Sequence, residues 1–240
     1  MHTLQHTFQL KIKPQQIYDF RGAVIDLAGP ENDLFHNREY NKGVWGNPIE
    51  RYPKIQYRVD DGSASLWAME EGVKALKKIM KKGNIAAFEM YDVETPLQTI
   101  KEKENKGFVP AVTEDWHYYH LRHFIPFNPE KYTEYRSKST YKEKISIIEK
   151  IIVDEILLFS YAINWSIPKE QRVKVELCDI LQKTVARLKT KSDTGDFFIA
   201  HPNSYYLQVR TNAALPDGIA LGRHKAYGYG VLETTEEDVL

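Results

Sequence analysis

Apolar and polar residues follow two different periods along the first half of the chain. A period of two, together with one short apolar run, predicts strands at residues 7–13, 54–59, 65–69 and 85–91. Apolar residues at helical spacing predict helices from Ile17 to Leu27 and from Val73 to Met80. The resulting order, β-α-β-β-α-β, is that of the ferredoxin-like fold.

Turn-forming and charged segments separate these elements. Residues 31–52 are predicted to form a long polar loop, and Asp60-Asp61-Gly62-Ser63 has the composition of a hairpin turn. Residues 95–112 are rich in lysine and glutamate and are predicted to connect two domains. We therefore place one domain at residues 1–110 and a second at residues 111–240.

The second half shows a similar but incomplete pattern. Strands are predicted at residues 117–125, 172–177, around 185–188 and at 205–210. Asn128-Pro129 has the composition of a helix start, and a capping box, Thr140 with Glu143, begins a long amphipathic helix. No second helix is evident in this half. The predicted fold class is therefore α+β with tandem ferredoxin-like domains, of which the second is degraded and carries a glycine-rich loop.

Composition adds constraints on partners and location. The 33 Lys and Arg residues balance 33 Asp and Glu residues, so the basic surplus common in nucleic-acid binders is missing, although a basic face remains compatible with this balance. The single cysteine, Cys178, excludes an intrachain disulfide and is expected to be buried and inert. Asp154 and Glu155 interrupt the longest apolar stretch, and no secretory signal is visible. A cytoplasmic protein without membrane segments is expected.

Four motifs occur in a defined order: Phe20-Arg21-Gly22-Ala23; Leu34-Phe35-His36-Asn37, followed by Arg51-Tyr52-Pro53-Lys54-Ile55-Gln56-Tyr57; Glu71-Gly72-Val73-Lys74-Ala75-Leu76; and Leu215-Pro216-Asp217-Gly218-Ile219-Ala220-Leu221-Gly222, followed by Gly228-Tyr229-Gly230. Together they resemble the CRISPR repeat-processing endoribonucleases of the RAMP superfamily, over most of the chain. The resemblance implies two tandem ferredoxin-like domains and metal-independent cleavage of CRISPR repeat RNA. In the implied reaction a ribose 2′-OH attacks the adjacent phosphate, leaving a cyclic phosphate and a free 5′-hydroxyl.

The resemblance also implies where the chemistry lies. His36 matches a motif position, and a histidine suits proton transfer because its pKa lies near neutrality. Without the resemblance, His36 is an ordinary loop histidine. The family motif is expected to carry a second histidine at position 38, where this chain has Arg38. A guanidinium stabilises phosphate charge but stays protonated, so it cannot shuttle a proton.

The donor for the leaving 5′-oxygen must then come from elsewhere, and Tyr40, Lys42 and His224 are the candidates. We expect His36 and Tyr40 to be catalytic. The expected RNA-binding residues lie on the first helix, the first loop and the glycine-rich loop: Arg21, Arg38, Lys42, Arg223, His224 and Lys225. Glycines allow backbone amides to approach phosphates closely, although a simple tight turn is the alternative.

Two further patterns have alternative interpretations. His117, His120 and His123 recur at every third position, but on a strand His120 faces away from the other two, and no cysteine or carboxylate pattern supports zinc. We expect no metal and no cofactor. Several tyrosines can stack on bases or simply belong to the sheet and core: Tyr118, Tyr119, Tyr205, Tyr206, Tyr227 and Tyr229.

Three hypotheses follow from these observations. The first is a CRISPR-RNA processing endoribonuclease whose partners are CRISPR repeat RNA, other CRISPR-associated proteins and a second copy of the chain, with no membrane partner. The second is a non-catalytic RNA-binding subunit of a CRISPR ribonucleoprotein complex, motivated by Arg38. The third is a small-ligand or regulatory ferredoxin-like protein, which the balanced charge keeps open.

Overall fold

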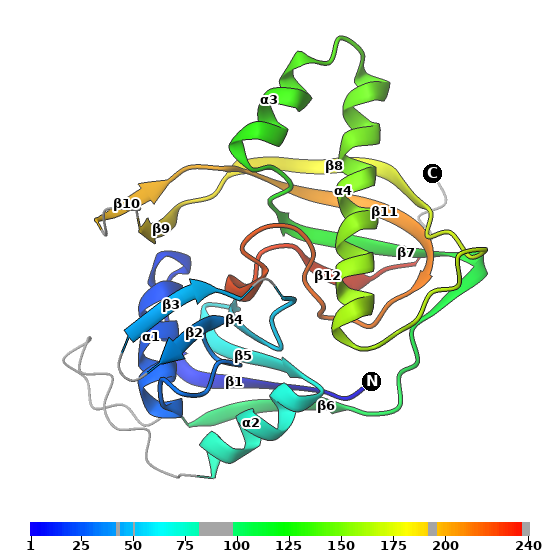
Figure 1. Ribbon diagram of the computed structural model, residues 1–240. Coiled ribbons are helices and arrows are strands. Elements are labelled where there is room, and N and C mark those ends of the chain that lie inside the picture. The colour runs from blue at the N-terminus through cyan, green and yellow to red at the C-terminus, as the bar shows by residue number, and fades with distance from the viewer. Residues whose placement is uncertain (42–43, 50, 82–97, 192–195, 237–240) are drawn as a thin grey trace. The chain divides into compact units, whose positions relative to one another are not determined.

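A computed structural model describes residues 1–41, 44–49, 51–81, 98–191 and 196–236. The chain forms two compact units, Met1–Phe108 and Val109–Leu240 (Figure 1). Within the described residues, no helix has both the length and the apolar character needed to cross a bilayer. Each unit contains a four-stranded antiparallel sheet.

The first unit follows the predicted order. Its elements are β1 (Thr3–Lys11), η1 (Pro14–Gln16), α1 (Ile17–Ala28), β2 (Arg38–Asn41), β3 (Val44–Pro48), β4 (Ile55–Asp60), β5 (Ser63–Met69), α2 (Glu71–Met80) and β6 (Thr99–Asn105). The main sheet has the strand order β4-β5-β1-β6, which is the ferredoxin-like arrangement. Its core includes Phe8, Phe20, Tyr57 and Leu66, whose side chains are fully buried because alternate strand positions and one helix face turn inward.

Two sequence predictions for this unit need correction. The supposed polar loop at 31–52 contains the β2–β3 hairpin, and the supposed connector at 95–112 contains β6, the strand that pairs with β1. The strand predicted at residues 85–91 lies outside the described residues. The hairpin turn was predicted correctly, because Asp61 and Gly62 both have positive φ, 50° and 74°, as a type I′ turn requires.

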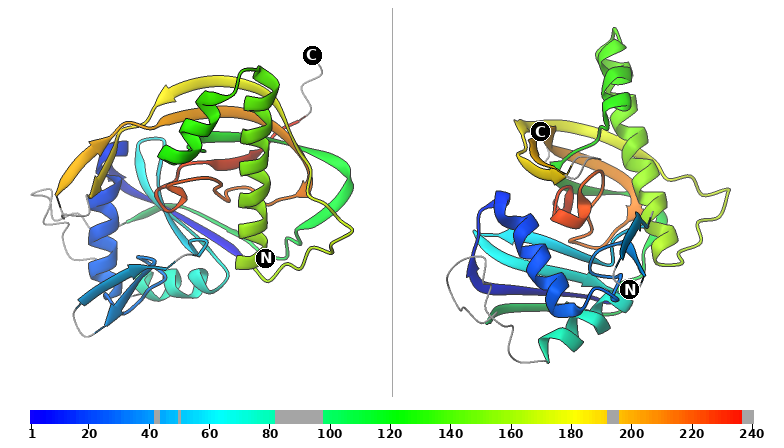
Figure 2. Two further views of the ribbon diagram at one scale, coloured as in Figure 1. Left: turned by 45° about the horizontal axis from the view of Figure 1, so that its top comes forward. Right: turned by 60° about the vertical axis from the view of Figure 1, so that its left-hand side comes forward.

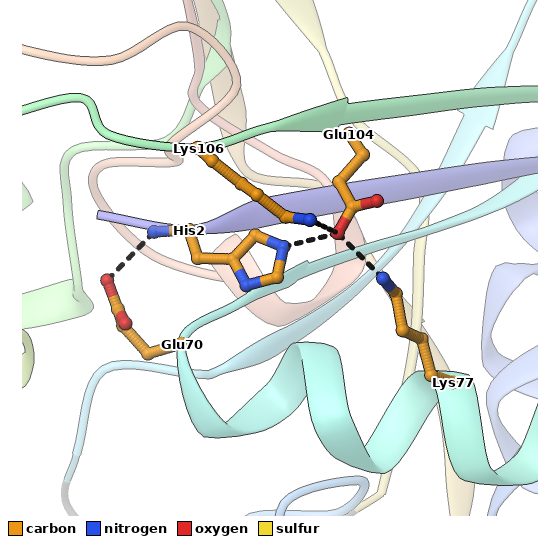
Figure 3. A network of polar contacts seen from close by, with 5 residues as sticks. All are labelled: His2, Glu70, Lys77, Glu104 and Lys106. Carbon is orange, nitrogen blue, oxygen red and sulfur yellow. Dashed lines mark hydrogen bonds and ion pairs between the residues drawn. The ribbon is translucent and has the colours of Figure 1, made fainter.

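A cluster of polar contacts ties three elements of the first unit together (Figure 3). Glu104 of β6 accepts from Lys77 of α2 at 2.7 Å and lies 2.6 Å from Nε2 of His2, just before β1. The ammonium group of Lys106 lies 3.3 Å from the same carboxylate oxygen. These contacts, led by the hydrogen bond from Lys77, hold the pKa of Glu104 at about 2.

The second unit repeats the topology with additions and one loss. Its elements are β7 (Ala111–Phe124), α3 (Pro129–Ser137), α4 (Tyr141–Ala162), β8 (Val175–Val185), β9 (Leu188–Lys191), β10 (Phe197–Ala200), β11 (Asn203–Ala214), η3 (Lys225–Tyr227) and β12 (Val231–Thr234). The sheet order β12-β7-β11-β8 matches that of the first unit strand for strand. A loop containing the short η3 stands where the second helix belongs. The fold is therefore two ferredoxin-like domains in tandem, the second degraded, as predicted.

The start signals for the helices of this unit are confirmed. The side chain of Asn128 caps α3 by accepting from the backbone amide of Lys131 at 2.7 Å, and Thr140 with Glu143 forms the predicted capping box of α4. Helix α4 lies across one face of the sheet (Figures 1 and 2). Cys178, expected to be buried, is exposed on β8, because the strand is an edge strand whose register shifts near this residue.

Candidate functional site

The loop between α1 and β2 is held from two neighbouring elements. Arg21 of α1 donates a hydrogen bond to the carbonyl of His36, and its guanidinium lies 5.9 Å from the ring centroid of Tyr57. The hydroxyl of Tyr57, on β4, donates to the carbonyl of Phe35 at 2.8 Å. Phe35 itself is buried in the core. Arg21 was predicted to contact RNA, and the structure places its side chain in contact with the loop.

Arg51 holds the same loop through contacts with Asn37 and Asp33. Its Nε donates to the amide oxygen of Asn37 at 3.1 Å, and its Nη1 lies 3.0 Å from a carboxylate oxygen of Asp33. Asn37 adopts a left-handed conformation with φ of 50°, and its carbonyl accepts from the amide of Ile49 at 2.9 Å. Arg51 and Tyr57 belong to the recognised motifs, but their role in the loop was not predicted.

His36 is buried within this loop, with 3% of its surface exposed. Its Nε2 lies 2.7 Å from the carbonyl oxygen of Pro30, and its Nδ1 accepts from the amide of Arg38 at 3.0 Å. A carbonyl can only accept and an amide can only donate, so the ring is neutral with its proton on Nε2. Desolvation by burial lowers the pKa of His36, and the guanidinium of Arg21 lowers it further, against the opposing effect of the Pro30 carbonyl. In this geometry both ring nitrogens are engaged with the backbone.

The residues that follow His36 lead away from the core. Arg38 is exposed at the start of β2, where its cation can meet a phosphate. Tyr40 lies in β2 opposite Trp45 of β3. Lys42 lies outside the described residues. The structure thus brings His36, Arg38 and the backbone of Tyr40 into one short segment.

The glycine-rich loop of the second unit, Leu215–Gly230, is fixed to the sheet by its own backbone. The amide of Leu215 donates to the hydroxyl of Tyr119 at 2.7 Å, and the amide of Arg223 donates to the carbonyl of Ile125 at 2.9 Å. The amide of Gly230 donates to the carbonyl of His123 at 3.2 Å. Amides that were expected to face RNA phosphates therefore donate to the protein at these positions.

The predicted cationic residues of this loop differ in their availability. Lys225 forms an ion pair of 2.6 Å with Glu155 of α4, and the two side chains are only 15% and 18% exposed. Its ammonium also donates to the carbonyl of Gly222 at 3.0 Å. Arg223 is exposed. Of this pair, Arg223 is the residue whose side chain faces solvent.

His224 belongs to an aromatic cluster that the sequence did not reveal. Its ring centroid lies 6.4 Å from that of Tyr229, and Tyr229 in turn lies 6.5 Å from His123. His224 has left-handed backbone geometry with φ of 58°. Desolvation by its neighbours, and then the charge of Arg223, lower the pKa of His224 to about 4. This histidine is therefore neutral at physiological pH.

The spaced histidines of β7 separate as the strand geometry predicts. His117 contacts Thr113 through Nε2 at 2.9 Å, whereas His120 points to the opposite face and lies 3.0 Å from the hydroxyl of Tyr206. Across the described part of the chain, no group of three or more His, Cys, Asp or Glu side chains is placed to hold a metal ion.

Comparison of the whole chain with known families matches both units. Residues 1–106 match the model of the Cas6b N-terminal domain, and residues 111–235 match that of the Cas6b C-terminal domain. No curated protein matches the chain in sequence.

Several solved structures share the fold over 98% of this chain. They include a crystal structure of Cas6b, with a TM-score of 0.73 at 14% identity, and a CRISPR RNA processing endoribonuclease Cas6b, with a TM-score of 0.64 at 14% identity, each covered over 100% of its length. A third is Csf5, a type IV Cas6 crRNA endonuclease, with a TM-score of 0.57, 13% identity and 99% of its length covered. At such low identities these similarities establish the arrangement of elements.

Proposed function

This chain belongs to the Cas6b family, and from that premise we propose that it is a metal-independent endoribonuclease that binds CRISPR repeat RNA and cleaves precursor crRNA. The observation that carries the proposal is the family match over both halves of the chain. The two solved endoribonucleases that share the fold support it. CRISPR repeat RNA is the proposed partner, with other CRISPR-associated proteins and a second copy as further partners, and the cytoplasm is the proposed compartment.

The proposed reaction is attack of a ribose 2′-OH on the adjacent phosphate. A base removes the hydroxyl proton, the new P–O bond closes a cyclic phosphate, and the bond to the 5′-oxygen breaks. An acid then protonates that oxygen, so that the product has a free 5′-hydroxyl. Cations stabilise the negative charge that develops on phosphorus oxygens in the transition state.

We assign the proton transfers to the loop between α1 and β2 and to β2 itself, with His36 and Tyr40 as the catalytic pair. The structure adds a condition for His36: its hydrogen bonds to the backbone of Pro30 and Arg38 must break before the ring can exchange protons with RNA. The backbone amide of Arg38 donates to Nδ1 of the ring. RNA that binds the exposed side chain of Arg38 would shift this backbone, and the hydrogen bond to His36 would then break.

The phosphate-binding role is assigned to Arg21, Arg38, Lys42, Arg223, His224 and Lys225, of which His224 is neutral and would contact phosphate by a hydrogen bond alone. Arg38 and Arg223 are exposed and can meet phosphate directly. Arg21 acts through the loop that it holds, and Lys225 must exchange Glu155 for phosphate. We further propose residues 1–110 and 111–240 as the functional domains, with the glycine-rich loop of the second contacting RNA.

Incubation of the purified protein with a candidate repeat RNA in EDTA tests the function. A discrete cut that leaves a cyclic phosphate is expected, and His36→Ala is expected to slow it. His36→Asn separates two roles, because an amide side chain can hold the loop by hydrogen bonds but cannot titrate. If His36→Asn cleaves at the wild-type rate, His36 is a positioning residue and the proton-transfer assignment is wrong.

A second candidate function is a non-catalytic RNA-binding subunit of a CRISPR ribonucleoprotein complex. Two observations favour it: both ring nitrogens of His36 are engaged, and Arg38 stands where a second histidine is expected. It requires tight, salt-dependent RNA binding without any product after long incubation. Product formation in EDTA excludes it.

A further inference from the structure

The sheet of the second unit has two chemically different faces. Alternate residues of its two central strands, such as Tyr119, Leu121, Leu207 and Val209, are buried on the side of α4. The residues between them point the other way and form what we call the outer face, where Gln208, opposite His120, is buried. The outer face is defined by Trp116, Tyr118, His120, Arg122, Tyr206 and Arg210.

Aromatic rings and guanidinium groups are paired across this outer face. The guanidinium of Arg210 lies 4.8 Å from the ring centroid of Trp116, and its Nη1 lies 3.4 Å from the hydroxyl of Tyr118. On the neighbouring part of the sheet, the guanidinium of Arg122 lies 5.7 Å from the ring of Tyr206. Two separate cation–π pairs therefore occupy adjacent strands.

The rings are also held in one orientation by their neighbours. His120 lies 3.0 Å from the hydroxyl of Tyr206, and the two ring planes meet at 72°. Trp116, Tyr118, His120 and Tyr206 all remain partly exposed. Rings held in one orientation lose little conformational entropy when a flat ligand stacks on them.

We propose that the outer face is a stacking platform for unpaired nucleotides of RNA. Bases of a single strand can stack on aromatic rings and on guanidinium planes exposed on a four-stranded sheet, whereas paired bases cannot reach them. Arg122 and Arg210 place cations beside each stacking position, where the phosphates of the strand pass. The proposal rests on RNA as the ligand of this chain, but on none of the residues of the His36 loop.

The charges of the outer face are compatible with this occupant. Arg122 pairs with Glu233 at 2.8 Å, and Arg210 pairs with Glu176 through side chains that are 34% and 50% exposed. Exposed ion pairs contribute little to stability, so a phosphate can displace either carboxylate. None of the six residues is aliphatic and two of them are charged, whereas the cores of protein interfaces are depleted in charge.

Binding of a short, fluorescently labelled oligouridine, which neither base-pairs nor contains a repeat, tests the proposal. Trp116→Ala and Tyr206→Ala are each expected to raise the dissociation constant roughly tenfold, because each removes one stacking ring. Trp116→Phe and Tyr206→Phe keep a ring and are expected to bind nearly as wild type does. The matched control is Tyr161→Ala on α4, which removes a tyrosine that is 79% exposed elsewhere on the same unit.

Arg122→Ala and Arg210→Ala are expected to lower the salt dependence of oligouridine binding, by about 0.7 in the logarithmic slope for each lost phosphate contact. Arg136→Ala on α3 is the matched control for an exposed arginine. Melting temperatures of all variants establish that each remains folded.

Three outcomes overturn the platform. The proposal is wrong if the wild-type protein fails to bind oligouridine. It is also wrong if the alanine variants bind oligouridine as tightly as the wild type does. If the same variants instead weaken self-association of the chain while oligouridine binding is unchanged, the outer face is a protein interface. Cleavage of repeat RNA, measured in parallel, separates this proposal from the nuclease. If repeat RNA is cleaved normally but the outer-face variants bind oligouridine as the wild type does, only the platform proposal is wrong. If the variants weaken oligouridine binding but no cleavage occurs, only the nuclease proposal is wrong.

Discussion

The Nδ1 atom of His36 accepts a hydrogen bond from the backbone amide of Arg38 at 3.0 Å. The histidine thereby sets the direction in which the chain leaves the loop and presents the arginine to solvent. A change at either residue is felt at the other, because the bond joins a buried ring to the backbone of the exposed residue. The chemistry proposed for this loop depends on that coupling.

Replacement of Arg38 by histidine is expected to accelerate cleavage of repeat RNA. The new imidazole would be exposed and would titrate near neutrality, so it could donate a proton that a guanidinium holds permanently. General acid–base catalysis contributes about 10²–10⁴-fold, so a rise of at least about tenfold in the single-turnover rate is expected.

Arg38→Lys is the matched control for that experiment, because it keeps the charge and has no group that titrates near pH 7. The lysine variant should cleave no faster than wild type. Equal rates for the histidine and lysine variants, measured from pH 6 to 9, would show that a missing proton donor at this position does not limit the reaction.

Lys225→Ala is expected to destabilise the second unit by about 3 kcal/mol, since it leaves the carboxylate of Glu155 largely buried without its cation. Replacing both residues, as in Lys225→Met with Glu155→Leu, should cost clearly less, because no charge is then left uncompensated. Urea unfolding measures both effects. A double variant that is less stable than Lys225→Ala would contradict this account.

RNA binding by the double variant also tests the proposed phosphate contact of Lys225.

Hydrophobic periodicity predicted most elements that bury a face, although it missed β12 with its buried Leu232, and it also missed β6 and the β2–β3 hairpin of the first unit. Strand β6, Thr-Ile-Lys-Glu-Lys-Glu-Asn, is an edge strand with one partner, and its charged residues resemble those of a linker. The β2–β3 hairpin contains Gly46 and Pro48, which argue against strands in a sequence. Both elements are specified by backbone pairing with other strands.

The candidate site was likewise predicted only in part from the sequence. Motif resemblance identified His36, but the partners of its two nitrogens, the carbonyl of Pro30 and the amide of Arg38, depend on the backbone path of the loop. The partner of Lys225 is Glu155, which lies 70 positions away in the chain on α4. The sequence pattern predicted that α4 packs through its apolar residues and gave no partner for Glu155. Residue types thus indicated the chemistry, and the folded path of the chain, local at His36 and long-range at Lys225, decided which groups are engaged.

Glu104→Gln is expected to lower the stability of the protein near pH 7 and to matter less in acid. The folded-state pKa of Glu104, about 2, lies below the ordinary value of 4.5, chiefly because Lys77 donates to the carboxylate. The folded state therefore binds this proton less readily than the unfolded state. The resulting stabilisation is complete above pH 4.5 and is lost as the pH falls toward 2.

Thermal unfolding of wild type and Glu104→Gln between pH 7 and pH 2.5 measures that difference. Glu102→Gln is the matched control on the same strand, because the Glu102 side chain is 52% exposed and lies 3.7 Å from His6. A difference between wild type and Glu104→Gln that stays constant with pH would rule out the ionised network as its cause.

Gly230→Ala is expected to disrupt the glycine-rich loop far more than Gly62→Ala disrupts the β4–β5 turn. Both glycines have φ of 74°, so alanine meets the same left-handed backbone penalty of about 1–2 kcal/mol at either position. At Gly62 nothing lies within 4 Å of the added Cβ, whereas at Gly230 the Cβ would lie 1.8 Å from the carbonyl oxygen of Leu221. That clash also displaces the 2.8 Å hydrogen bond from the amide of Leu221 to the carbonyl of Gly230. Gly230→Ala should therefore lose several kcal/mol more in urea unfolding, or fail to fold its second unit, and equal losses for the two variants would show that the loop can open here at little cost.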